Sequence, residues 1–168
     1  MRQIRYNVFE TNSSSTHSLV LLKKEKPEYY THDEMYEELK WRIKEDGAYK
    51  PWDELYFGRS PFQILRTFKE KLHYAYANTH GDEDKMEEVT SVLRELVPEV
   101  TYFVPYDEYI GVDDTTVPYW LKELGISLKE FLTNKKYVVI CDGDEYCVWE
   151  EMKRSGLINS DSIEKEID

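Results

Sequence analysis

The sequence has little cysteine, little glycine and no long apolar run. Its 168 residues include two cysteines, Cys141 and Cys147, which do not make a disulfide framework and, without a second pair, do not make a zinc site. We expect both to be reduced thiols. The longest apolar runs, at 18–22 and 137–141, are much shorter than the roughly 18 residues that span a membrane, and the N-terminus lacks a signal-peptide core. These absences predict a soluble, cytoplasmic protein.

Positive charge is also scarce. The chain has 22 Lys and Arg against 34 Asp and Glu, which gives a formal net charge of −12. Such a balance repels the phosphates of DNA and RNA and argues against direct binding of nucleic acid. It favours instead a partner protein whose surface is rich in Lys and Arg.

Four segments have the pattern of β-strands. Apolar and polar residues alternate over 4–9, and the continuous apolar run at 18–23 predicts an interior strand. Two further strands are expected at 100–104 and 137–141. The small polar residues at 10–17 favour a turn or hairpin between the first two strands.

Capping signals and apolar periodicity predict five helices. Thr31 with Glu34 starts a helix that ends near Gly47, and Ser60 with Gln63 starts a second that ends at 78–81. Further helices are expected over 82–96, over 118–124 and after the cap Ser127. Residues 144–154 fit either a last helix or a hairpin with 145–149 as its return strand.

These elements predict a single α+β domain over residues 1–159. Its mixed sheet has about four strands and packs with about five helices, and a charged, frayed tail follows at 160–168. The expected core comprises apolar strand residues and the inward stripe of a helix, namely Leu19, Leu21, Leu65, Phe68, Leu72, Val138 and Ile140.

A hydroxyl-rich segment precedes the second strand and consists of Ser13, Ser14, Ser15, Thr16 and His17. A hydroxyl beside an imidazole is the raw material of a nucleophile and base, but adjacent residues seldom align for catalysis, and no partner Asp is evident. Such a loop can also hold a phosphate. The favoured interpretation is architectural, with the hydroxyls capping local backbone amides.

Two carboxylate-rich segments offer ligand types suited to a divalent cation, at 80–84 and at 142–145. Neither matches a known coordination spacing, and helix caps and turns explain both. An alternative enzyme hypothesis uses Asp142, Asp144 and either Asp113 or Asp114 as ligands of a metal-dependent hydrolase or nuclease. The preferred interpretation assigns no catalytic residue, no metal and no cofactor.

Tyrosines next to acids indicate an interaction surface. The chain has 14 Tyr, and rigid aromatic contact area flanked by carboxylates suits a basic protein partner. The loop between Pro105 and Val117 concentrates this pattern without an obvious core role. The predicted partner-binding residues are Tyr106, Asp107, Glu108, Tyr109, Asp113 and Asp114.

The opening MRQIRYNVFETNSSSTHSLVL resembles the start of a group of uncharacterised phage and mobile-element proteins of Firmicutes, and KYVVICDGDEYCVWEEMKRSGL at 136–157 is similar to the C-terminal part of that group. The resemblance covers about 40 residues and implies a phage-type protein acting in the host cytoplasm. By analogy of composition and origin, it resembles inhibitors of host nucleic-acid enzymes, including anti-CRISPR proteins against Cas9. We therefore expect an inhibitor that mimics DNA in a basic groove, the alternatives being the hydrolase and a noncatalytic structural or regulatory module.

Overall fold

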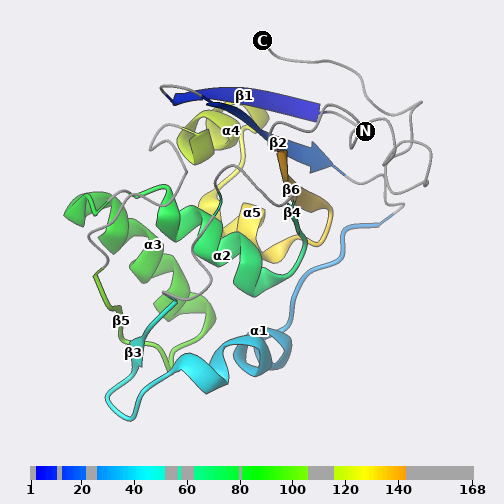
Figure 1. The fold of residues 1–168 in the computed structure, drawn as a ribbon. Helices are drawn as coiled ribbons and strands as arrows, with labels where there is room; N and C mark the ends of the chain where they lie inside the picture. Colours follow the sequence, from blue (N-terminus) through cyan, green and yellow to red (C-terminus); the bar gives the residue numbers. More distant parts are fainter. Residues whose placement is uncertain are drawn as a thin grey trace.

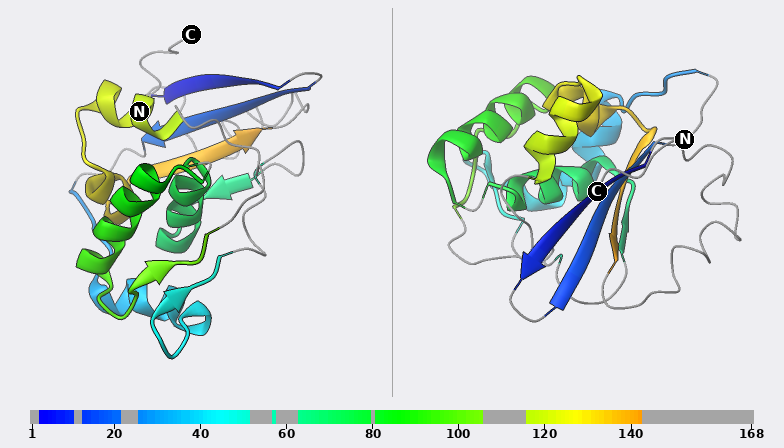
Figure 2. Two further views of the ribbon diagram at one scale, coloured as in Figure 1. Left: turned by 90° about the vertical axis from the view of Figure 1, so that its left-hand side faces the viewer. Right: turned by 90° about the horizontal axis from the view of Figure 1, so that it is seen from above.

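The fold is α+β, as predicted, with its helices gathered on one side of a four-stranded sheet (Figures 1 and 2). The computed structural model describes residues 3–10, 13–21, 26–51, 57, 63–79, 81–105 and 116–142. A two-stranded sheet lies at the far end of the helical layer (Figure 1). None of the helices in these segments has the length and apolar character needed to cross a membrane.

The four-stranded sheet has the order β1-β2-β6-β4, and each neighbouring pair is antiparallel. Its strands are β1 (Gln3–Glu10), β2 (Ser13–Leu21), β6 (Tyr137–Asp142) and β4 (Gln63–Leu65). Leu19 of β2 pairs with Val139 of β6, and both side chains are fully buried. The described part of the apolar run, 18–21, therefore belongs to an interior strand, because β2 lies between β1 and β6.

The prediction of a turn over 10–17 is wrong for Glu10 and for residues 13–17, which are paired in strands. Ser13–His17 belongs to β2 and pairs with β1, from Ser13 opposite Glu10 to His17 opposite Tyr6. β1 pairs with all of Ser13–His17, and β6 pairs with Thr16 and His17 on the other side. The capping role of the hydroxyls stays a prediction. The hairpin itself is confirmed, and it leaves two residues, 11 and 12, between the paired strands.

Capping boxes set the starts of two helices. In α1 (His32–Leu39), the Thr31 hydroxyl accepts from the amide of Glu34, and the Glu34 carboxylate accepts from the amide of Thr31. Thr67 and Glu70 make the same pair of bonds at α2 (Phe68–Ala77). The remaining helices are α3 (Glu83–Leu96), α4 (Thr116–Leu124), α5 (Leu128–Thr133) and the short 3-10 turn η1 (Lys40–Arg42).

Two predicted helix boundaries are wrong. The first helix ends at Leu39 and continues only through η1, because Ile43 leaves the helix to form a β-bridge with Tyr49. The second begins at Phe68 and not at Ser60, because Thr67 provides the operative cap. Residues 63–65 instead extend the edge of the sheet as β4, paired with β6.

Aromatic residues tie the second, smaller sheet to the helices. Its strands β3 (Ala48–Tyr49) and β5 (Tyr102–Phe103) pair in parallel. Of the two, β5 lies within the predicted strand 100–104. Tyr49 packs edge-on against Phe103, whose ring stacks on Tyr76 of α2 at 4.3 Å between centroids. The buried hydroxyl of Tyr49 lies 2.7 Å from Nε2 of His73. This small sheet therefore extends the main core to the end of the helical layer.

The predicted core is largely confirmed. Six of the seven expected residues are buried, while Leu21 at the end of β2 is half-buried. Trp120 of α4 stacks on Tyr74 of α2, with 5.6 Å between ring centroids, and both side chains are fully buried. These contacts place α4 against α2 in the region where α3 and α5 also pack.

A buried lysine joins α2 to the end of α5. The Lys71 ammonium has no exposed surface and donates to the carbonyls of Phe131 and Asn134, each at 3.0 Å. A cation at a helix C-terminus satisfies carbonyls that have no partner within the helix. Lys71 thereby fixes α5 and the chain that leads into β6.

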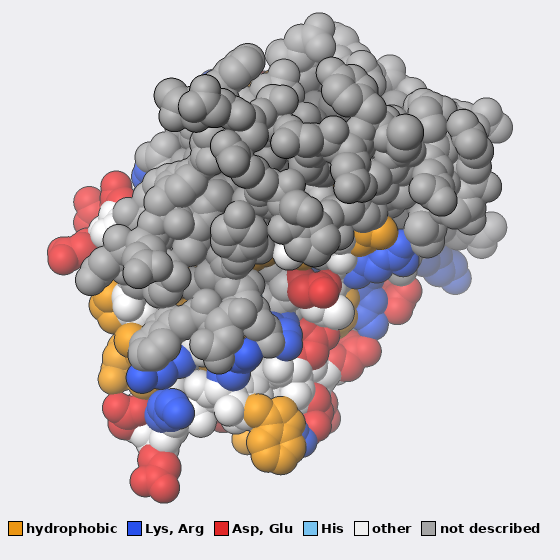
Figure 3. Space-filling view, in the orientation of Figure 1, with side chains coloured by type: hydrophobic (Ala, Val, Ile, Leu, Met, Phe, Trp, Pro, Cys, Tyr) orange, Lys and Arg blue, Asp and Glu red, His pale blue; other side chains and the backbone are white. Residues whose placement is uncertain are grey.

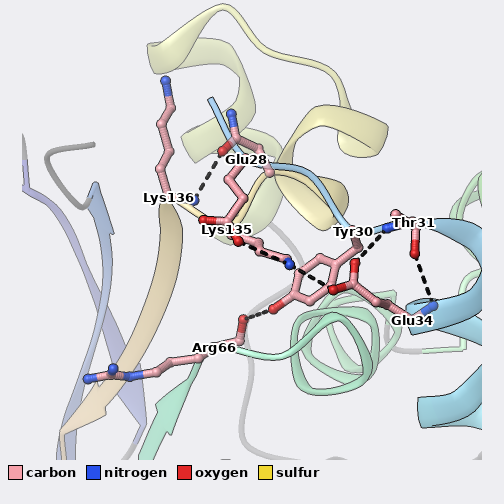
Figure 4. A network of polar contacts seen from close by, with 8 residues as sticks. Glu28, Tyr30, Thr31, Glu34, Arg66, Lys135 and Lys136 are labelled. Atoms are coloured by element: carbon pink, nitrogen blue, oxygen red, sulfur yellow. Dashed lines mark hydrogen bonds and ion pairs between the residues drawn. The ribbon is translucent and has the colours of Figure 1, made fainter. Parts of the chain in front are cut away.

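A polar network around Tyr30 holds α1 against the body (Figure 4). The Tyr30 hydroxyl donates to the carbonyl of Arg66, and Lys135 lies 4.8 Å above its ring while donating to Glu34. Burial, followed by the nearby carboxylate of Glu38, raises the pKa of Tyr30 to about 12. The network therefore holds α1 in place beside the sheet and α2.

Candidate interaction surface

The predicted partner-binding residues, Tyr106, Asp107, Glu108, Tyr109, Asp113 and Asp114, lie outside the described residues. The same is true of Asp144 and of the helix or hairpin predicted over 144–154. Asp142 is the last residue of β6. Within the described ranges, no three His, Cys, Asp or Glu side chains are grouped closely enough to hold a metal ion.

The carboxylate-rich segment at 80–84 begins α3, as predicted. Gly81 has a positive φ of 74°, and Asp82 is the N-cap, its carboxylate accepting from the amides of Asp84 and Lys85 at 3.1 Å. An acid at this position satisfies unpaired helix amides and interacts favourably with the helix dipole. His80 lies outside the described residues.

Carboxylates line the solvent-facing side of α3, most of them near its N-terminus. Val89, Leu93 and Leu96 are buried on the opposite side. The acidic side chains on the exposed side are Glu83, Asp84, Glu87, Glu88 and Glu95. Figure 3 shows acidic atoms gathered at the left edge of the molecule, over the start of α3. We call these five residues the α3 acidic face.

Two of these carboxylates have basic partners at the surface. Glu87 accepts from the guanidinium of Arg94 at 2.9 Å, and Glu95 pairs with Lys129. Exposed ion pairs of this kind contribute little to stability, about 0–1 kcal/mol each. They reduce the negative charge at Glu87 and Glu95, so the acidic character is strongest at Glu83, Asp84 and Glu88.

The acidic surface continues from the end of α3 to α1. His32 of α1 lies 3.1 Å from the carboxylate of Glu99 and 3.3 Å from that of Asp33, and its ring stacks on Tyr36. The hydrogen bond to Glu99, followed by that to Asp33, raises the pKa of His32. This imidazole therefore links two exposed acids from separate elements.

An exposed aromatic residue lies at the end of α1. Trp41 of η1 is 86% exposed, which is far more than the other large hydrophobic side chains described. Lys40 lies 5.3 Å from the centre of its ring and pairs with Glu37. Because charges of both signs surround Trp41, its neighbourhood does not define the charge of a partner.

Sequence reasoning missed most of the α3 acidic face. It assigned the acidic first turn of the 82–96 helix to the helix dipole, and it placed the partner surface on the loop before Val117. The available signal was the recurrence of acids at 84, 88 and 95, on the side opposite the apolar stripe.

Comparison with known proteins gives no relative on which to base a function. No family model, no curated protein and no solved structure matches the chain.

Proposed function

We propose that the chain is a noncatalytic binding protein that inhibits a nucleic-acid enzyme of a bacterial host by occupying its Lys- and Arg-lined groove. The observation that carries this proposal is the α3 acidic face. Four of its five carboxylates lie between Glu83 and Glu88, and Glu95 follows about 10 Å further along the helix axis at 1.5 Å per residue. A row of closely spaced carboxylates has the sign of a nucleic-acid backbone and is complementary to a groove lined by Lys and Arg.

Other described features support a binding role. Exposed acids outnumber exposed Lys and Arg on the described surface, which agrees with the net charge of −12. Complementary charge steers association and selects partners. The resemblance to phage proteins makes a Cas nuclease the first enzyme to test.

Face-specific charge reversal tests the proposal. The double variant Asp84→Lys/Glu88→Lys alters the α3 acidic face without removing a partner of Arg94 or Lys129. Its matched control, Glu45→Lys/Glu123→Lys, changes two exposed acids outside α3 and alters the net charge equally.

In the assay, the heparin-binding fraction of a bacterial lysate is applied to each immobilised protein, and the proteins that are retained are measured. We expect nucleic-acid enzymes to be retained by the wild type and the control, released by excess heparin, and lost with the α3 double variant. Equal loss of retention in the two variants would assign the binding to overall charge, and equal retention by all three proteins would show that the α3 acidic face has no role.

The loop at 106–114 stays a predicted part of the same interface. Charge reversal at Asp107, Glu108, Asp113 and Asp114 together is expected to slow association with a retained enzyme more than it speeds dissociation, because charges at an interface rim act mainly on encounter. An unchanged association rate would remove this loop from the interface.

A further inference from the structure

A small pocket opens beside the α3 acidic face. It lies among α2, α3, α4 and α5 and has a volume of about 100 Å³. Most of its lining is apolar, contributed by Ala75, Val89, Val117, Pro118, Leu121 and Leu128. Val89 is on α3, so the pocket and the acidic face share a helix.

The polar groups inside the pocket are engaged by the protein itself. The side-chain carbonyl of Asn78 accepts from the amide of Val117 at 3.2 Å, and the Thr79 hydroxyl donates to the carbonyl of Tyr76 at 2.7 Å. Both residues are only 4% exposed. The pocket therefore presents mainly hydrocarbon to an occupant.

Charged residues from α3 also line the pocket. Glu88 is an exposed member of the α3 acidic face, and Lys85 is half-buried one turn earlier. Asp84 lies four residues before Glu88, on the same side of the helix. An occupant would thus meet an apolar environment whose charged lining is the carboxylate of Glu88 and the ammonium of Lys85, with Asp84 one turn before Glu88 on the helix.

We propose that this pocket receives one aliphatic side chain, of the size of leucine or valine, from the basic protein partner, whose adjacent Lys or Arg pairs with Glu88 and Asp84. This inference rests on the proposed function and adds the shape of the recognised segment. A cavity of about 150 Å³ holds the six carbons of benzene, so one of about 100 Å³ accommodates roughly four. A leucine or valine side chain matches that size, whereas the ring of tryptophan is too large.

The aliphatic side chain of the partner, which acts as an anchor, and its basic residues have separate roles in binding. The basic residues accelerate encounter with the acidic face, and the buried aliphatic group slows dissociation. Buried anchors surrounded by a polar rim commonly dominate the affinity of an interface. The pocket would therefore distinguish the correct partner from other basic proteins.

Synthetic peptides provide the test. The probes are nine-residue peptides of eight lysines with a central leucine, alanine or tryptophan, titrated against the full chain at several salt concentrations. We expect the leucine peptide to bind about tenfold more tightly than the alanine peptide, through slower dissociation. The tryptophan peptide should gain no more than a small fraction of this preference.

Two variants locate the effect. Leu121→Trp fills the pocket from α4 and should abolish the preference for leucine while preserving the salt-dependent binding of the alanine peptide. Glu123→Trp is the control, since Glu123 is exposed on α4, lies outside α3 and does not line the pocket. It should retain the tenfold preference.

Methyl NMR of the wild-type chain makes the test independent of whether Leu121→Trp folds. The leucine peptide should shift the methyl signals of Val89, Val117 and Leu128, but not those of the buried Leu39 on α1.

Equal binding of the leucine and alanine peptides would overturn the inference and leave the proposed function intact. Failure of every lysine peptide to bind would contradict both. Two other results would assign the pocket to a different occupant and overturn the inference. One is that free isobutanol binds in the pocket as tightly as the leucine peptide. The other is that the chain forms a dimer and that Leu121→Trp dissociates it.

Discussion

Replacing Lys71 with methionine is expected to destabilise the protein by about 2–4 kcal/mol. The substitution keeps the length and apolar stem of the side chain but removes the ammonium. In the wild type that ammonium is fully buried, donates to Phe131 and Asn134, and lies 5.5 Å from the centre of the Tyr30 ring.

The size of this loss of stability follows from the two carbonyl groups that remain when the ammonium is removed. A hydrogen bond from a charged donor contributes about 1.5–3 kcal/mol net of the water it displaces, so two of them give roughly 3–6 kcal/mol. The loss should be smaller, because the Asn134 carbonyl still accepts from the amide of Tyr137 at 3.3 Å and methionine avoids the dehydration of a charge. The Phe131 carbonyl loses its bond to Lys71, and a buried acceptor left unpaired costs about 1–3 kcal/mol.

Urea unfolding followed by circular dichroism measures this difference. Lys122→Met on α4 is the control, because Lys122 is exposed and its replacement should change stability by less than about 0.5 kcal/mol. A Lys71→Met protein as stable as the wild type, or more stable, would refute the reasoning. It would show that the free energy lost in dehydrating the ammonium is at least as large as the stabilisation that its hydrogen bonds provide.

Two further predictions concern the core and the link between α1 and α3. Leu72→Ala should cost roughly 2–5 kcal/mol in urea unfolding, because Leu72 is fully buried, and a loss under about 0.5 kcal/mol would contradict its place in the core. The raised pKa of His32 means that its contribution to stability is fully present below its unfolded pKa of about 6.5 and is lost as pH rises through its folded pKa. The stability difference between wild type and His32→Gln should therefore be larger at pH 5.5 than at pH 8.5, and a difference that grows with pH would contradict the link to Glu99 and Asp33.

Local signals predicted much of the fold. Capping residues located the start of α1 at Thr31, of α3 at Asp82 and of α5 at Ser127, because each satisfies helix amides through bonds within a few residues. The apolar run at 137–141 identified the buried strand β6. Such features depend on residues that are close in the chain and can therefore be predicted from the sequence.

Features set by distant partners were harder to predict. Residues 63–65 follow a plausible helix signal, yet they form β4 because β6 offers an edge to pair with. Ser13–His17 has the composition of a turn, yet β1 and β6 draw it into a ladder. The pocket was also beyond sequence reasoning, since its lining comes from four helices separated along the chain.

The α3 acidic face carries the charge that the sequence predicts for a partner surface, but it lies on residues other than those predicted. Net charge alone indicated a basic partner, because charge needs no knowledge of the fold. The position of the α3 acidic face required knowing which side of the helix is buried. The apolar stripe of Val89, Leu93 and Leu96 contains that information once the helix phase is read correctly.

Competition with DNA tests the central claim most directly. The measurement is the affinity of a retained nucleic-acid enzyme for its DNA in the presence of increasing concentrations of the chain. If the α3 acidic face occupies the DNA groove, the apparent Kd for DNA should rise in proportion to the concentration of wild type or of the Glu45→Lys/Glu123→Lys control, and should stay constant with Asp84→Lys/Glu88→Lys. Unchanged DNA affinity with the wild-type chain at saturating concentration would contradict the claim.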